Sequence, residues 1–158
     1  MTDSSLVKVE RLECADEYAV SVWRRLMLLV WLDKANTVGI ERSRVLFDEW
    51  VKDQPHGALF LVVVPGQRTR APDDKTRRAM TLAASTRHPR CLGIATLLEA
   101  QGFIAASVRS IMTRLHAGGG ANVFGSTAEA ASWAAPLLLD SAITSAALAE
   151  AIRASREG

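Results

Sequence analysis

Two spacings of apolar residues alternate along the chain, one typical of strands and one typical of helices. Residues 18–23 and 26–32 are mostly apolar, rich in β-branched and aromatic side chains, and separated by Arg24 and Arg25. This pattern predicts two antiparallel strands joined by a tight turn. Residues 7–14 alternate less regularly between apolar and charged side chains, and they predict an edge strand ahead of this hairpin.

Further strands are predicted where short apolar runs are bounded by turn residues. Residues 58–64 and 91–98 are almost entirely apolar, which is typical of strands covered on both faces of a sheet. Residues 122–124 predict a short last strand. Apolar side chains at helical spacing predict helices over residues 37–53, 72–88, 102–117, 126–138 and 140–156.

The same spacing predicts which residues of these helices face the core. They are Val38, Val45, Leu46, Trp50 and Val51 in the first helix, Met80, Ala83 and Ala84 in the second, and Ala130, Trp133, Ala134 and Leu137 in the fourth. Ser126 and Glu129 have the spacing of a capping box, in which each side chain accepts a hydrogen bond from the other residue's backbone N–H. The last helix has a weaker apolar stripe, which either the same chain or a second copy would bury.

The order of these elements predicts the fold class. Buried strands that alternate with helices imply parallel crossover connections, whereas the opening hairpin is antiparallel. We therefore expect an α/β fold with a mixed, mostly parallel sheet, an antiparallel N-terminal hairpin and helices packed on the sheet. The length of 158 residues suits a single domain over residues 1–158, with residues 140–158 as an appended C-terminal helix.

Composition narrows the class of protein. With 49% hydrophobic and 23% charged residues, the chain is typical of a globular domain rather than a disordered one. Its longest apolar run, residues 26–32, is far shorter than the roughly 20 residues of a membrane-spanning helix. The first residues lack the pattern of a secretory signal. Cys14 and Cys91 lie in apolar, strand-like segments typical of buried free thiols, and we expect a reducing, cytoplasmic setting. A disulfide between them is the alternative if their two strands are neighbours in the sheet.

Charge is unevenly distributed, although the formal net charge is only +2. Residues 65–90 hold seven basic side chains against Asp73 and Asp74. Such a stretch either forms a solvated helix face or attracts phosphate groups. It lacks the interleaved aromatic residues of single-strand binders, so we treat nucleic acid as the less favoured partner.

Two motifs resemble a known family. The segments FGSTAEAASW at residues 124–133 and LEAQGF at residues 98–103, with the predicted order of elements, resemble the STAS or anti-sigma-factor-antagonist domains, in particular uncharacterised bacterial members of the SpoIIAA-like branch. The resemblance covers residues 17–138. It implies a regulatory module that binds a protein partner. Regulatory members carry a phosphorylated Ser or Thr, and the matching segment offers Thr69, although without the usual Asp-Ser context.

The candidate site lies where two parallel strands end. Ligands of parallel sheets bind outside the carboxyl ends of the strands, and Arg68, Arg70, Glu99 and Gln101 follow two such ends. Glu99 there is either a general base or cation ligand, or a carboxylate that only favours the positive end of the next helix. Arg109, about two helical turns after Gly102, is a further candidate for ligand contact, with a tertiary salt bridge or a solvated side chain as the alternative.

These observations lead to three hypotheses. The first is a non-catalytic STAS-like module that binds a protein partner, a second copy of itself or a small anionic ligand, with no cofactor and no metal. The second is a small enzyme that uses Glu99 as acid or base. The third is a protein that binds nucleic acid or anionic lipid through residues 68–90, with affinity that falls steeply with salt.

Overall fold

The computed structural model describes residues 7–66, 72–99, 121–140 and 142–157, together with Ala106 and Ser110. The strands are β1 (Glu10–Cys14), β2 (Tyr18–Trp23), β3 (Leu26–Trp31), β4 (Ala58–Val64), β5 (Cys91–Leu98) and β6 (Ala121–Phe124). The helices are α1 (Thr37–Trp50), α2 (Asp74–Ser85), α4 (Thr127–Leu138) and α5 (Ser145–Ala154), and a short 3₁₀ helix, Val51–Asp53, follows α1.

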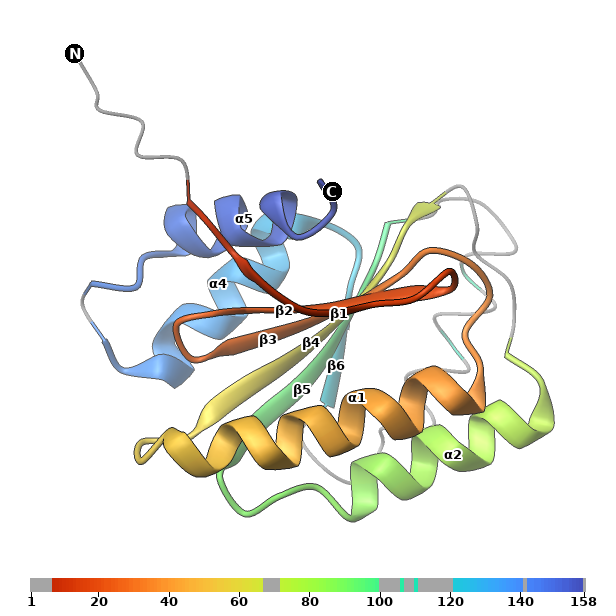
Figure 1. The fold of residues 1–158 in the computed structure, drawn as a ribbon. Coiled ribbons are helices and arrows are strands. Elements are labelled where there is room, and N and C mark those ends of the chain that lie inside the picture. The colour runs from red at the N-terminus through yellow and green to blue at the C-terminus, as the bar shows by residue number, and fades with distance from the viewer. Residues whose placement is uncertain are drawn as a thin grey trace.

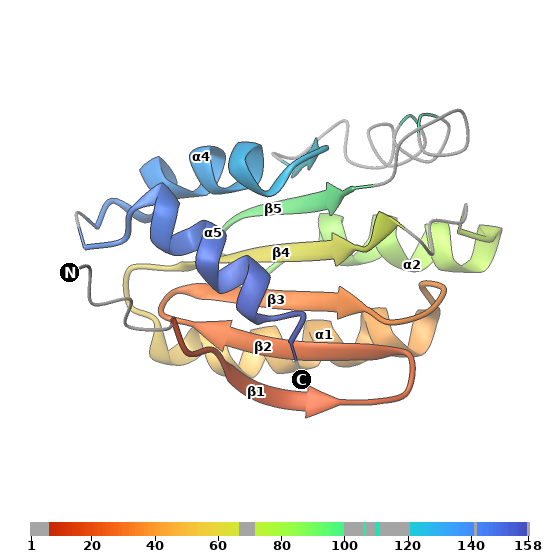
Figure 2. The same ribbon diagram turned by 90° about the horizontal axis from the view of Figure 1, so that it is seen from above.

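The six strands form one sheet in the order in which they occur along the chain. β1, β2 and β3 are antiparallel, and β3, β4, β5 and β6 are parallel. Helices α1 and α2 cover one face of the sheet, and α4 and α5 cover the other (Figures 1 and 2). This architecture confirms the predicted α/β fold with a mixed sheet, an antiparallel N-terminal hairpin and a C-terminal helix.

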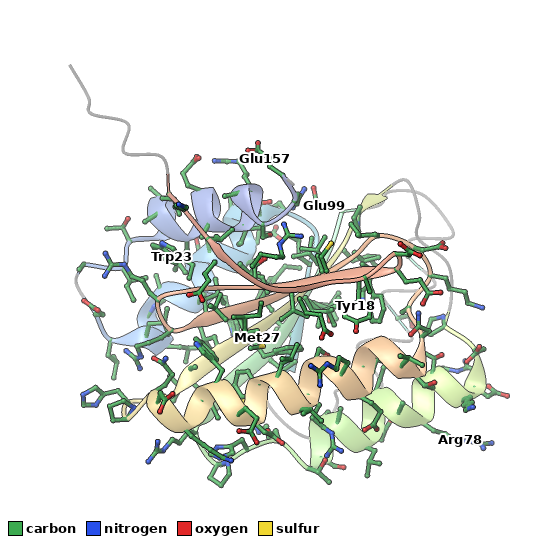
Figure 3. The ribbon with its side chains drawn as sticks, in the orientation of Figure 1. Tyr18, Trp23, Met27, Arg78, Glu99 and Glu157 are labelled. Carbon is green, nitrogen blue, oxygen red and sulfur yellow. The ribbon has the colours of Figure 1, made fainter. Side chains whose placement is uncertain are left out.

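Strand β3 shows how the sheet builds a core on each face. Successive side chains of a strand point to opposite faces. Leu26, Leu28 and Val30 therefore join the core under α4 and α5, whereas Met27 joins the core against α1 and α2. Figure 3 shows Met27 on the α1 side of the sheet. Because both faces of β3 are covered, its residues form a continuous apolar run and do not alternate between apolar and polar side chains.

Helix α1 packs through a face that only partly matches the predicted one. Val51 is buried, and Leu46 and Trp50 pack against the same core, as predicted. Val38 and Val45 are 70% and 44% exposed, and the buried positions include Gly39, Ile40 and Phe47. The ring of Trp31 explains the difference, because a Cβ atom on Gly39 would lie only 2.6 Å from its Cη2 atom. A glycine carries little weight in a pattern of hydrophobic side chains, yet here it marks the side of the helix that contacts the sheet.

Helix α2 is shorter than predicted and begins later. Asp73 is its N-cap and accepts a hydrogen bond from the Thr76 N–H at 2.8 Å, so Pro72 precedes the helix and does not occupy its first turn. The helix ends at Ser85, several residues before Pro89. Thr76 is the one buried residue of this helix.

The α4–α5 layer departs from the prediction in small shifts. Ser126 accepts from the Glu129 N–H, but the Glu129 carboxylate accepts from the Gly125 N–H instead of that of Ser126. Leu138 is buried where Leu137 was expected, since Leu137 is 36% exposed.

Helix α5 is shorter than the predicted range and packs on α4 and on the sheet. It crosses the face of the strands next to α4 (Figure 2). Leu148 and Ile152 are fully buried in the same core as Leu26 and Leu28. The apolar stripe of the last helix is therefore buried within the same chain.

The two cysteines are both free thiols, and they differ in exposure. Cys91 is buried as expected, whereas Cys14 at the end of edge strand β1 is exposed. The prediction of a buried Cys14 is wrong because an edge strand has a neighbour on one side only. In the sheet order, β1 and β5 are separated by three strands.

Candidate functional site

Glu99 is the predicted site residue that the structure describes. It follows β5, and its carboxylate forms an ion pair with the Arg156 guanidinium, each side chain being 29% exposed. Nη2 of Arg156 also lies 3.4 Å from the Thr127 hydroxyl at the start of α4. Glu99 is thus held by the C-terminal segment, and Figure 3 shows it on the α5 side of the sheet.

This ion pair connects the end of β5 to the C-terminal segment. Within the described residues, Oε1 of Glu99 accepts no hydrogen bond with good geometry and Nε of Arg156 donates none. Partly buried pairs of this kind join segments more than they add stability. Glu99 does not line the hollow described below. The other predicted site residues, Arg68, Thr69, Arg70, Gln101 and Arg109, lie outside the described residues.

A hollow of about 80 Å³ lies between the sheet and helices α1 and α2. Its floor consists of side chains from β3, β4 and β5, and its walls come from the two helices. The apolar lining residues are Leu29, Trp31, Ile40, Phe47, Phe60, Val62, Met80, Ala83, Ala84 and Ile94. A concave, largely apolar site with a few polar groups is the usual form of a small-molecule site.

Small side chains on the helices create this hollow. Ala83 and Ala84 of α2 face the sheet above Phe60 and Val62, which remain half-buried. The larger Leu82 of α2 points outward and is 53% exposed. A helix that places alanine inward and leucine outward leaves the sheet incompletely covered.

Polar side chains line the hollow on its two helical walls. Arg44 and Asp48 come from α1, and Arg87 and His88 follow α2. Arg44 pairs with Glu41 at 3.2 Å on the same helix. Nδ1 of His88 accepts the Arg90 backbone N–H at 3.1 Å. The lining also includes the buried Ser43 of α1 and Thr96 of β5, so the hollow combines a largely apolar lining with a few polar and charged side chains.

Cys91 begins β5 and lies in the wall of the hollow. Its side chain is 7% exposed, and its thiol lies 3.5 Å from the Gly93 carbonyl oxygen. Burial raises the pKa of the Cys91 thiol, so the group stays protonated near neutral pH. A protonated thiol is a weak nucleophile, so Cys91 is poorly suited to nucleophilic catalysis near neutral pH, and it reacts with an alkylating reagent only slowly there.

Sequence reasoning missed this hollow and its polar residues. The sequence predicts a site at the carboxyl ends of the strands, whereas Arg44, Asp48 and Arg87 lie beside one face of the sheet. The sequence does contain one indication of the hollow, because its helical spacing places two alanines on the inward face of α2. Whether small inward residues leave a space or bring two elements closer depends on the neighbouring helix, which the sequence pattern does not place.

The basic stretch does not form one continuous surface in the part of the chain that is described. Arg77 pairs with Asp74, and Arg90 donates to the Lys52 carbonyl oxygen at 2.7 Å. Arg78 extends from α2 away from the sheet (Figure 3), whereas Arg87 lines the hollow. These side chains point in several directions, which gives the nucleic-acid hypothesis no specific support.

Two further properties bear on the class of site. Across residues 7–66, 72–99 and the described C-terminal part, no group of three or more His, Cys, Asp and Glu side chains is arranged to hold a metal ion. Among the described helices, none has the length and apolar character needed to cross a membrane.

Comparisons were made with protein-family models, with curated proteins and with solved structures, and none of the three gives a match.

Proposed function

We propose that this protein is a non-catalytic, cytoplasmic binding module of the STAS-like kind, and that its ligand is a small molecule held in the hollow between α1, α2 and the sheet. The single observation that carries this proposal is the apolar hollow itself. The STAS resemblance and a protein partner, which it implies, remain part of the proposal and rest on the sequence motifs.

The energetics of the hollow support a ligand. The apolar side chains that line the hollow lack packing partners on that side, and they forgo the contact energy that such partners would supply. A bound apolar group recovers part of that free energy, because it restores the missing contacts. The inward alanines on α2 are thus unfavourable for stability and favourable for binding.

The described side chains favour binding over catalysis. Glu99 is engaged by Arg156, and the Cys91 thiol is protonated because of burial. Nucleophilic catalysis needs a nucleophile next to a base, with a third group that orients the base. The enzyme hypothesis based on Glu99 therefore has less support than the binding hypothesis.

Alkylation of Cys91 tests this proposal. In a Cys14→Ser variant, Cys91 is the remaining cysteine, and its reaction rate with iodoacetamide reports access to the hollow. We expect small branched alcohols and carboxylates to slow this reaction. We also expect Ala83→Leu to fill the hollow, to slow alkylation without a ligand and to raise the thermal midpoint.

Ala146→Leu is the matched control, because Ala146 is exposed on α5 on the opposite side of the sheet. It should leave both the alkylation rate and its response to small molecules unchanged. If no small molecule slows alkylation and Ala83→Leu behaves like Ala146→Leu, the hollow is not a binding site and the proposal is wrong.

A further inference from the structure

We propose that the ligand of the hollow is an uncharged, largely apolar molecule with a short branched body. This inference rests on the proposed function and adds the chemical class of the ligand. Three features carry it, namely polar lining groups that already interact within the protein, formal charges that balance, and an apolar interior of limited volume.

The two hydroxyl groups in the lining are deeply buried. Ser43 of α1 is 2% exposed and Thr96 of β5 is 1% exposed. The Ser43 hydroxyl donates to the Ile40 carbonyl oxygen at 3.0 Å, within the same helix. A hydroxyl group is uncharged, whereas a buried ion needs a charged partner or several hydrogen bonds to offset its lost hydration. These two groups therefore suit a neutral molecule better than an ion.

The larger polar side chains of the lining already interact within the protein. The Arg44 guanidinium pairs with Glu41 at 3.2 Å. Arg87 also has an interaction partner, and Nδ1 of His88 accepts the Arg90 backbone N–H at 3.1 Å. An ionic ligand would compete with these interactions, so its gain from a new partner would be offset in part by the loss of an existing one.

Formal charge at the hollow gives no preference for either sign. Arg44 and Arg87 are the basic residues of the lining, and Asp48 is its acidic residue. Glu41 pairs with Arg44 and supplies a second negative charge beside the lining. With a neutral His88, the positive and negative side chains therefore cancel. An anion and a cation would both lose hydration on entry without an excess of opposite charge to compensate for it.

The rest of the lining is apolar. Phe60 and Val62 of β4 face the hollow from the sheet, and Ala83 and Ala84 of α2 face it from the helical layer. Burial raises the pKa of the Cys91 thiol, and a protonated thiol behaves as a small hydrophobic group. Water gains few hydrogen bonds on such a surface, whereas an apolar molecule leaves water and gains dispersion contacts there.

The volume limits the apolar body. The hollow of about 80 Å³ is roughly half of the 150 Å³ cavity that holds benzene in an engineered protein. A branched chain of about four or five carbons is therefore a better fit than a long acyl chain. Ala83 and Ala84 set this limit on the side of α2, since a larger side chain at either position would occupy the space.

Two matched pairs of probes test the charge of the ligand. Methyl isobutyl ketone and isovalerate have nearly the same shape, and so have isoamyl alcohol and isoamylamine. The second member of each pair is an ion at neutral pH. Each neutral probe should bind at a concentration at least about fivefold lower than its ionic counterpart, because the ion loses hydration that the lining does not replace.

The methyl group of Met80 reports binding, because Met80 lines the hollow. We would titrate each probe at equal ionic strength and follow the methyl resonances of protein with isotopically labelled methionine. Met80→Leu assigns the resonance among the four methionines of the sequence. Met27 is the internal control, since it is fully buried on the same side of the sheet and is not one of the lining residues. Its resonance should move much less.

Xenon tests whether the apolar interior is sufficient for binding. It has no polar group, and it enters dry apolar cavities in other proteins. Dissolved under pressure, it should shift the Met80 resonance. A response to the ketone without a response to xenon would show that binding depends on a polar contact.

Variants test the location and the polar wall. Ala83→Leu should abolish the Met80 response to every probe, whereas Ala146→Leu, on the opposite side of the sheet, should preserve it. Arg44→Gln should change the half-saturation concentration of the ketone by less than about twofold, because a neutral ligand does not need the guanidinium. The thermal midpoint of each variant checks that it is folded.

The outcomes distinguish this inference from the proposed function. A smaller difference within either pair, the reverse order, or binding of the ketone without binding of xenon overturns the uncharged, apolar class, while the hollow remains a binding site. If none of the probes shifts Met80 more than Met27, or if Ala83→Leu retains the shift, the hollow is not the binding site and both proposals fall.

Discussion

Gly39 contributes to the fold by the side chain it lacks. It lies on the face of α1 that contacts Trp31 of β3 and Tyr18 of β2. A Cβ atom at this position would lie 2.6 Å from Cη2 of Trp31 and 3.0 Å from Cδ1 of Tyr18. The absence of a side chain lets the helix approach these two rings, which themselves make an edge-on contact with centroids 6.1 Å apart.

We expect Gly39→Ala to destabilise the protein by about 1–3 kcal/mol, because the added methyl group forces the Trp31 ring or the helix to move. Chemical denaturation followed by circular dichroism measures the change. Val38→Ala is the control on the adjacent position. Val38 is 70% exposed, so this substitution should change the stability by no more than about 0.5 kcal/mol. A larger loss at Val38 than at Gly39 would contradict the observed face of α1.

Tyr18 is the single tyrosine of the sequence, and it is buried at the start of β2. Its hydroxyl donates to Glu13 Oε2 at 2.7 Å, and Glu13 Oε1 pairs with Arg42 Nε at 2.8 Å. Burial, together with the hydrogen bond to Glu13, raises the pKa of Tyr18 to about 12. In the unfolded chain the pKa of a tyrosine is about 10.

This raised pKa predicts a loss of stability at high pH. The unfolded state releases the Tyr18 proton first, so the stabilisation is complete below pH 10 and is lost as the pH rises from about 10 to about 12. Absorbance near 295 nm should show Tyr18 ionising late in the native protein and normally in denaturant. In Tyr18→Phe, the fall in unfolding free energy across this pH interval should be smaller. An equal fall in both proteins would show that Tyr18 is not responsible.

At the scale of elements, Arg25 connects three of them. It ends the turn between β2 and β3, and its Nε donates to the Gly57 carbonyl oxygen at 2.9 Å. Its Nη2 donates to the His56 carbonyl oxygen at 2.6 Å, and its Nη1 donates to the carbonyl oxygen of Leu138 at the end of α4. One guanidinium thus satisfies carbonyl groups at the start of β4 and at the C-terminal end of a helix, where a positive charge is favourable.

We expect Arg25→Gln to lower the unfolding free energy by about 2–3 kcal/mol, because it leaves these carbonyl groups without their charged donor. Arg24→Gln removes the same charge from the neighbouring position. The Arg24 guanidinium lies over the Trp23 ring, 5.6 Å from its centroid, and we expect a loss of at most about 1 kcal/mol there. Denaturant titration of the two variants compares them directly. Equal losses would mean that charge, and not the three hydrogen bonds, is what matters at Arg25.

At the scale of the whole molecule, two helical layers enclose the sheet, and they do so unequally. The α4–α5 side has a tightly buried core that includes Leu138, Leu148 and Ile152. The α1–α2 side contains the hollow, and in α2 only the Thr76 side chain is fully buried. The proposed binding site therefore lies in the less tightly packed layer, and the last helix covers the other face of the sheet.

This division predicts where substitutions are most harmful. Leu148→Ala should lower the unfolding free energy by about 2–5 kcal/mol, as expected for a fully buried leucine that leaves a cavity. Glu150→Ala on the exposed side of α5 should cost no more than about 0.5 kcal/mol. Thermal and denaturant unfolding measure both. A near-zero effect of Leu148→Ala would show that α5 is an accessory to the domain and not a part of its core.

The local elements were largely predictable from the sequence. Apolar runs such as residues 26–32 and 58–64 indicated β3 and β4 because a strand covered on both faces has no exposed positions to interrupt the run. Capping residues located the start of α4 at Ser126, since its hydroxyl satisfies a backbone N–H that the helix itself leaves unpaired. These properties depend on interactions within a few residues of one another, and they therefore appear as short patterns.

The site was less predictable, because it depends on contacts between residues that lie far apart in the sequence. Val38 is exposed and Gly39 faces the sheet, because the Trp31 ring of another element lies against Gly39. Glu99 was recognised as a polar residue at a strand end, but its partner Arg156 lies at the other end of the chain, where no pattern connects the two.

The sequence by itself determined the type and order of the elements, the mixed sheet and the buried character of its central strands, because each depends on hydrophobic spacing and local hydrogen bonds. Only the tertiary structure decided which face of α1 meets the sheet, that Glu99 is held by Arg156, and that Ala83 and Ala84 leave a hollow beside Arg44, Arg87 and Cys91. The physical reason is that a space between elements is a property of their distance and orientation, and these are set by many packed side chains together rather than by any one segment.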